Sequence, residues 1–136
     1  MSRALALSMA TTDIAFLAYW LASAAFVAGW IEIPPAYLFA DYHEIRVFAW
    51  NWSFLPLDVA FSVVGLLAIG AARRGQASWR GLAVASLVMS SAAGGMAVSY
   101  WTILGEFEPG WFLPNLVLFL WPLLFLPTLV RTTSDG

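Results

Sequence analysis

The sequence predicts an all-α fold: an integral membrane bundle of four transmembrane helices with cytoplasmic N- and C-termini. The first observation is composition. Hydrophobic residues make up 62% of the 136 residues and charged residues only 10%, whereas a soluble domain carries charge at about a quarter of its positions. The second is that the apolar residues gather in four long runs, and the third is that arginines and acidic residues fall in alternate breaks between these runs.

Each apolar run is long enough for a helix to cross a hydrocarbon core, which takes ~20 residues. The runs are approximately 4–31, 47–72, 81–105 and 110–130. A backbone in lipid must satisfy its own hydrogen bonds, and the chain lacks the ten-residue alternating segments of a β-barrel, so we expect helices. No repeat or long linker divides the sequence, and we therefore expect residues 1–136 to form a single transmembrane domain.

The basic residues predict the orientation. All six are arginines, and five of them fall at the N-terminus, in the break after the second run, or just after the fourth run. These five are Arg3, Arg73, Arg74, Arg80 and Arg131. The opposite loops hold five acidic residues and only Arg46. By the positive-inside rule the arginine-rich side is cytoplasmic, so we expect a multi-pass protein of the cell's inner (plasma) membrane.

The longest connection, residues 32–46, contains signals for a helix end and a helix start. Pro34 begins a Pro-Pro pair that should stop the first helix. Asp41 followed by Glu44 has the spacing of a helix cap, which predicts that the second helix begins near Tyr42. The apolar stretch 37–39 between these signals is either an interfacial anchor or a lid over the mouth of the bundle.

Several kinds of chemistry lack their residues. The chain has no cysteine, which excludes thiolate metal sites and thiol catalysis. His43 is the single histidine, and a metal site needs three or four converging ligands, so we expect a surface histidine, no metal and no cofactor. Nucleotide loops, nucleophile elbows and nucleic-acid patches are not found either, so no nucleic-acid partner is expected.

The segment WNWSFLPLDVAF, residues 50–61, carries polar residues inside the second run. Asn51 and Asp58 are seven apart and therefore lie on one face of a helix. Pro56 between them cannot donate to the carbonyl of Trp52, so the helix should bend there and leave a free acceptor. An aspartate at the bilayer centre costs at least ~2.5 kcal/mol, so Asp58 should point into the bundle. We expect Asn51, Trp52 and Asp58 to bind a ligand or a proton.

A second acid, Asp13, interrupts the first run. From the approximate ends of the runs, Asp13 and Asp58 are expected near the same level of the membrane, close enough to interact. Two carboxylates in one dry site cannot both ionise cheaply, which predicts a coupled ligand- or proton-binding site. Asn115 in the fourth run lies at the depth of Asn51 and extends this candidate site. Alternatively, these polar residues only hydrogen-bond neighbouring helices together.

Small residues and prolines shape the last two runs. Ser86, Ser90 and Gly94 recur every four residues, a spacing that lets helix backbones approach closely. This face is expected to pack on another helix, within the chain or in a homodimer. Pro114, Pro122 and Pro127 should bend or break the fourth helix, and the last two should release backbone carbonyls within the membrane.

The order of the polar and aromatic residues resembles the YvaD-like family of small bacterial membrane proteins. The segments that carry the resemblance are Asp13-Ile14, Tyr19-Trp20, Tyr37-Leu38-Phe39, Asp41-Tyr42, Trp50-Asn51-Trp52-Ser53-Phe54 and Pro56-Leu57-Asp58. It covers the first half of the chain, and the second half matches in hydrophobic pattern only. The resemblance implies a bacterial four-helix membrane protein and carries over no catalytic residue.

Three functions fit these residues. The first is binding or transport of a small cationic or apolar ligand through a polar site that includes Asp13 and Asp58. The second is an intramembrane enzyme that acts on a lipid or polyprenoid by acid–base chemistry. The third is a structural or accessory subunit. We rank binding or transport first and expect membrane lipids, a small-molecule ligand and a second copy of the chain as partners.

Overall fold

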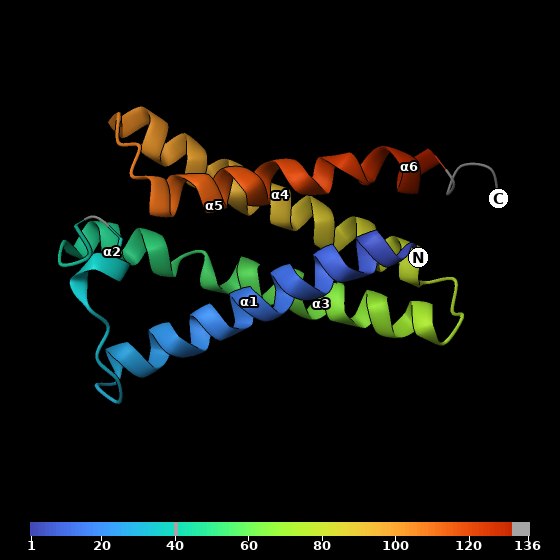
Figure 1. Cartoon of the computed structure of the whole chain (residues 1–136), viewed down its shortest axis with the longest axis horizontal. Helices are drawn as coiled ribbons and strands as arrows, with labels where there is room; N and C mark the ends of the chain where they lie inside the picture. Colours follow the sequence, from blue (N-terminus) through green and yellow to red (C-terminus); the bar gives the residue numbers. More distant parts are fainter. Residues whose placement is uncertain (40, 132–136) are drawn as a thin grey trace.

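The computed structural model describes residues 1–39 and 41–131, and in that part of the chain the protein is helical without strands. The elements in order are α1 (Arg3–Val27), η1 (Pro35–Tyr37), α2 (Ile45–Trp52), α3 (Leu55–Arg73), α4 (Trp79–Leu104), α5 (Pro109–Leu120), η2 (Trp121–Leu124) and α6 (Leu126–Arg131). They form four rods along one axis (Figure 1). Each rod is long and apolar enough to cross a membrane, which confirms the predicted all-α, four-helix membrane fold.

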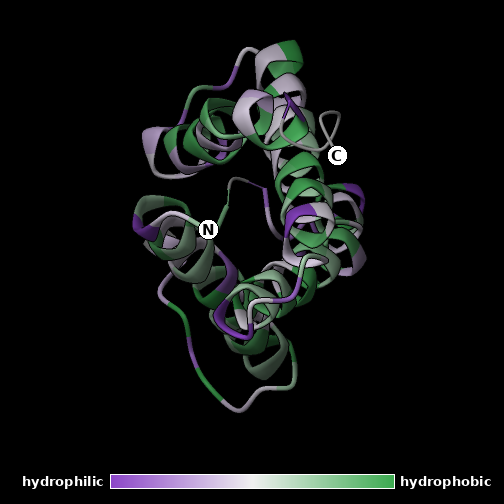
Figure 2. Ribbon diagram, turned by 90° about the vertical axis from the view of Figure 1, so that its right-hand side faces the viewer, coloured by the Kyte–Doolittle hydropathy of each residue, from purple (hydrophilic) through white to green (hydrophobic). Residues whose placement is uncertain are grey.

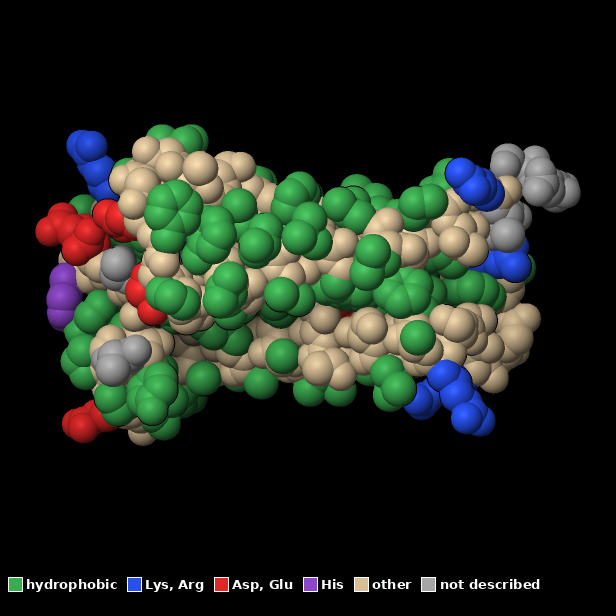
Figure 3. Space-filling view, turned by 45° about the horizontal axis from the view of Figure 1, so that its top comes forward, with side chains coloured by type: hydrophobic (Ala, Val, Ile, Leu, Met, Phe, Trp, Pro, Cys, Tyr) green, Lys and Arg blue, Asp and Glu red, His purple; other side chains and the backbone are tan. Residues whose placement is uncertain are grey.

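The ends of the molecule differ in charge. Both termini lie at the same end of the bundle (Figure 1). Arginines gather at that end, whereas the exposed acidic residues and one arginine lie at the other (Figure 3). The structure thus separates the charges as the loops predict, and the side of the membrane on which each end lies stays a prediction.

Helix α2 begins later than its cap signal indicates. Asp41 adopts a left-handed conformation, with φ of 55°, and the Glu44 amide donates to the Asp41 carbonyl at 2.8 Å. This backbone turn replaces the predicted side-chain cap. The helix starts at Ile45, so the expected start near Tyr42 is wrong.

The second rod is broken, as the proline predicts. Helix α2 ends at Trp52, and α3 begins at Leu55. The Ser53 hydroxyl donates to the Trp50 carbonyl at 2.6 Å, which satisfies one backbone acceptor at the break. Pro56 lies in the first turn of α3, where its missing amide removes no intrahelical bond.

The fourth rod changes helix type at its prolines. Glu108 caps α5 by accepting from the amides of Gly110 and Trp111 at 3.1 and 3.0 Å. Pro114 lies inside α5 without ending it. Near Pro122 the chain forms the short 3₁₀ helix η2 before α6 continues to Arg131. The predicted interruption of the fourth helix is therefore confirmed.

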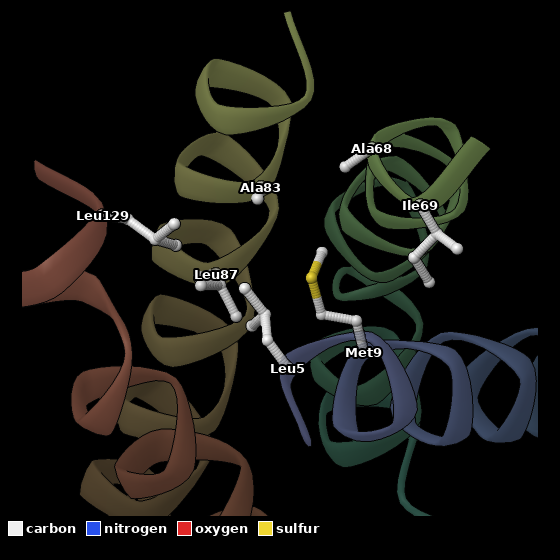
Figure 4. Packing of buried hydrophobic residues seen from close by; sticks show 7 residues of the cluster. All are labelled: Leu5, Met9, Ala68, Ile69, Ala83, Leu87 and Leu129. Carbon is white, nitrogen blue, oxygen red and sulfur yellow. The ribbon is translucent and has the colours of Figure 1, made fainter. Parts of the chain in front are cut away.

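Two buried clusters hold the rods together. The first lies toward the ends of the chain and joins α1, α3, α4 and α6 (Figure 4). Its buried members are Leu5, Met9, Ala68, Ile69, Ala83, Leu87 and Leu129. The second lies in the other half and contains Trp20, Phe54, Phe61, Ala93, Ala97 and Leu118. Helix α1 packs mainly against α3, and α5 packs mainly against α4.

The small-residue face of α4 packs within the chain. A Cβ atom placed on Gly94 would stand 2.7 Å from the Asn115 carbonyl oxygen, so only glycine allows α5 to lie this close. Ser91 donates to the Phe119 carbonyl at 2.8 Å, and Ser86 donates to the Phe61 carbonyl on α3 at 2.9 Å. The predicted close packing is confirmed on both sides of α4.

Hydrophobic residues occur all along the helices, as the end-on view shows (Figure 2), and hydrophobic side chains cover much of the face between the charged ends (Figure 3). On α1, for example, Leu7 and Leu21 are 69% and 73% exposed. Exposed apolar surface of this extent is stable when lipid is the solvent.

Candidate functional site

A cavity of about 260 Å³ lies among α1, α2, α3, α4 and α5, in the half of the bundle away from the chain ends. We call it the Asp58 cavity. Half of its lining residues are aromatic: Phe16, Tyr19, Trp20, Phe39, Trp50, Phe54, Trp101 and Trp111. Its polar lining residues are Asn51, Asp58 and Asn115, together with the Tyr19 hydroxyl. An apolar cavity with a few converging polar groups is the common form of a small-molecule site.

Asp58 is the charged residue of this cavity. Its side chain is 4% exposed, so it points into the bundle as predicted. The Trp20 indole nitrogen donates to Asp58 Oδ2 at 2.9 Å. The other oxygen, Oδ1, is buried and accepts no hydrogen bond within the described structure. Asp58 also lies in the first turn of α3, where the helix dipole favours negative charge.

Asn51 lines the cavity beside Asp58 and is held by α1. Its amide nitrogen donates to the Tyr19 hydroxyl at 3.2 Å. The Tyr19 ring makes edge-to-face contacts with Trp20 and Trp111, with ring centroids 5.0 and 6.0 Å apart. This packing fixes the Tyr19–Asn51 pair at one end of the cavity.

Trp52 belongs to a neighbouring cavity of about 300 Å³, which we call the outer cavity. The outer cavity lies beneath the connection between α1 and α2. Tyr19, Phe39, Asn51 and Trp111 line both cavities and so separate them. Phe39 is only 8% exposed, whereas Tyr37 is 72% exposed. The stretch 37–39 thus buries the Phe39 ring between the two cavities, whereas Tyr37 lines the outer cavity and stays largely exposed.

The remaining two candidates differ in position. Asn115 lines the Asp58 cavity, although its amide donates to the carbonyl of Trp111 in its own helix at 2.7 Å. Asp13 does not line either cavity. It is 1% exposed and lies against Gly65, at a point where Ser86 of α4 also approaches.

The antiparallel register keeps the two acids apart. Asp13 lies opposite Gly65, and Trp20 lies opposite Asp58. Along α1 from Asp13 to Trp20, and along α3 from Asp58 to Gly65, the distance is seven residues, or roughly 10 Å at 1.5 Å per residue. The expectation that Asp13 and Asp58 share one level is therefore wrong. The expectation was based on the ends of the apolar runs. The register between α1 and α3 depends instead on how their side chains fit together, and the run ends carry no information about that fit.

Sequence reasoning missed the residues that position the site. Trp20 and Tyr19 hold Asp58 and Asn51, and Gly65 makes room for Asp13. One signal was present: Trp20 follows Asp13 by the same seven residues that separate Asp58 from Gly65. His43 is exposed, as expected, and its ring is tilted by 38° against the Tyr42 ring, with the ring centroids 3.7 Å apart. Within the described residues, no three acidic, histidine or cysteine side chains cluster as a metal site would need.

Four apolar rods around an apolar cavity with a few buried polar groups define a helical, membrane-embedded protein. A model described as a family of unknown function, DUF5360, matches residues 5–135, and the chain belongs to this family. It is similar to the "Uncharacterized protein YvaD" of Bacillus subtilis (strain 168), with 38% identity over 120 residues, which are 88% of this chain and 86% of that protein. The predicted YvaD-like resemblance is confirmed. No solved structure matches the chain.

Proposed function

We propose that the protein binds a small, largely apolar ligand that presents a cation or a hydrogen-bond donor to Asp58. The observation that carries this proposal is the free oxygen of Asp58 in an aromatic cavity. A buried acceptor without a partner is costly, and a donor or cation on the ligand would satisfy it. The expected location is the inner membrane, with the arginine-rich end in the cytoplasm.

The walls of the Asp58 cavity suit the same ligand. The faces of Trp20 and Trp101 attract cations within about 6 Å of a ring centre, and they also bury apolar groups. The amide of Asn51 offers a hydrogen bond at the end of the cavity. Such a wall selects for shape and for one polar group, so the ligand is expected to be compact and mostly hydrocarbon near Asp58.

Transport is the second candidate, because the outer cavity adjoins the Asp58 cavity at the Tyr19–Asn51 pair. A ligand that passes between them would move toward the acidic end of the bundle. Catalysis has less support. Acid–base enzymes commonly pair two titratable groups with opposed roles, and the second buried acid, Asp13, does not line the cavity with Asp58.

The two buried aspartates provide a matched test. The wild type, Asp58→Asn and Asp13→Asn would be purified in mild detergent, and bound small molecules would be identified by mass spectrometry. Both substitutions preserve shape and remove one carboxylate from a membrane helix, but only Asp58 lines the cavity. We expect the ligand to accompany the wild type and Asp13→Asn, and to fall at least tenfold in Asp58→Asn. An equal ligand content in all three proteins would contradict the proposal.

A further inference from the structure

A groove of about 550 Å³ runs along the outside of the bundle between α1 and α5. The space-filling view shows such a furrow between two rows of helices (Figure 3). Its α1 side extends from Thr11 to Phe16, and its α5 side extends from Pro109 to the start of η2 at Trp121. The wall is almost entirely apolar, and Leu113 and Val117 on it are 54% and 61% exposed. In a membrane this groove faces lipid.

The groove and the Asp58 cavity share a wall. Ala15, Phe16, Pro114 and Leu118 line both of them. Ala15 and Pro114 are exposed to the outside, whereas Leu118 is 3% exposed. The passage from lipid to cavity therefore runs past these few side chains, and Ala15 presents only a methyl group to it.

The packing of the rods explains why the passage exists. Helix α1 packs mainly on α3, and α5 packs mainly on α4. The α1–α3 contact is fixed by the Trp20–Asp58 bond and by Gly65, and the α4–α5 contact is fixed by Gly94 and Ser91. These contacts join α1 and α5 to different partners and not to each other, so they do not close the groove.

We infer that the ligand enters the Asp58 cavity sideways from the bilayer, between α1 and α5, and that it is a single-chain amphiphile. This inference rests on the proposed function. The polar or cationic end reaches Asp58 Oδ1, and the hydrocarbon chain extends into the groove. The groove extends along thirteen residues of the fourth rod, from Pro109 to Trp121, which is roughly 18 Å of helix. Charge complementarity at Asp58 and the apolar wall together select this class of ligand.

The absence of native cysteine makes the route measurable. Ala93 lines the cavity and is 2% exposed, so Ala93→Cys places one thiol inside with little change in volume. The protein would be reconstituted in phosphatidylcholine vesicles. Its thiol would be reacted either with N-dodecylmaleimide, which dissolves in the bilayer, or with a charged, water-soluble methanethiosulfonate. Mass spectrometry would give the rate of each reaction.

Three alanines of α1 provide matched plugs for the two routes. Ala15 lines the lateral groove, Ala22 lines the outer cavity, and Ala18 is exposed without lining a cavity described above. Each would be changed to Phe in the Ala93→Cys protein, so the added volume and the helix are the same. Ala15→Leu would serve as a smaller plug if Ala15→Phe lowers the melting temperature.

We expect Ala15→Phe, or Ala15→Leu, to slow the reaction with N-dodecylmaleimide at least tenfold, whereas Ala18→Phe and Ala22→Phe change it less than twofold. A tenfold effect of Ala22→Phe alone would assign entry to the outer cavity and overturn the inference. A thiol that reacts with neither reagent until the protein is denatured, or that is slowed equally by all three plugs, would also overturn it. This measurement involves neither Asp58 nor the ligand. A negative result would therefore overturn the lateral route without contradicting the proposed ligand binding, which the Asp58→Asn experiment tests separately.

Discussion

Gly94→Ala tests the close contact between α4 and α5. The added Cβ would lie 2.5 Å from the Phe119 amide nitrogen and 2.9 Å from the Leu118 carbonyl carbon. Ordinary contacts begin near 3.4 Å, so α5 must retreat by about 0.9 Å, the difference between 3.4 and 2.5 Å. Since the obstacle is backbone, no rotamer change relieves it. Overpacking of this kind costs typically 1–3 kcal/mol.

Gly81→Ala is the matched control, because Gly81 lies in the same helix and a Cβ there meets nothing within 4 Å. Both substitutions gain the same intrinsic helix preference of alanine over glycine, up to about 1 kcal/mol. The difference between the two variants therefore isolates the overpacking term, and we expect Gly94→Ala to be less stable by about 1–3 kcal/mol.

The assay is reversible unfolding in mixed micelles of mild detergent and sodium dodecyl sulfate, followed by circular dichroism. Gly94→Leu should unfold still more readily than Gly94→Ala, because its larger side chain forces a larger shift of α5. Equal free energies of unfolding for Gly94→Ala and Gly81→Ala, within about 0.5 kcal/mol, would refute the described contact between α4 and α5.

Three further predictions concern topology and the buried acids. Gln76→Cys should not react with an impermeant maleimide added outside intact cells, and labelling there would reverse the predicted orientation. Trp20→Phe removes the donor to Asp58 and should lower the free energy of unfolding by about 1–3 kcal/mol; an equal loss in an Asp58→Leu background would argue against that bond. Gly65→Ala should destabilise the protein because its methyl group meets the Asp13 carboxyl, and Asp13→Ala should restore part of the loss. If it restores nothing, the obstacle lies elsewhere.

The features that sequence predicted well are those that lipid imposes locally. Hydropathy gave four rods because a membrane leaves the backbone few alternatives to a helix. The high cost of an exposed acid predicted that Asp58 points inward, and the missing amide of proline predicted the breaks near Pro56 and Pro122. Each of these effects depends on one residue and its solvent, so it can be predicted from the sequence without knowing which helix packs against that residue.

The features that sequence reasoning missed depend on contacts between helices. The level of Asp13 relative to Asp58 follows from how Gly65 accepts a side chain from α1, and hydropathy contains no register. The donor to Asp58 is Trp20. The chain has eight tryptophans, and nothing in the sequence distinguishes the one that donates to Asp58. The start of α2 was missed because Asp41 closes a backbone turn and does not act as a side-chain cap.

The equal spacing on α1 and α3 has a consequence for how such chains can change over generations. Seven residues separate Asp13 from Trp20, and seven separate Asp58 from Gly65. A single register between α1 and α3 therefore brings Asp13 to Gly65 and Trp20 to Asp58 at the same time. An insertion or deletion inside either interval would turn one end by about 100° and shift it by 1.5 Å, which breaks one pairing while the other is kept. Side chains in these intervals can vary, but the number of residues between the paired positions cannot. Alignments of related chains are expected to show substitutions and no gaps across both intervals.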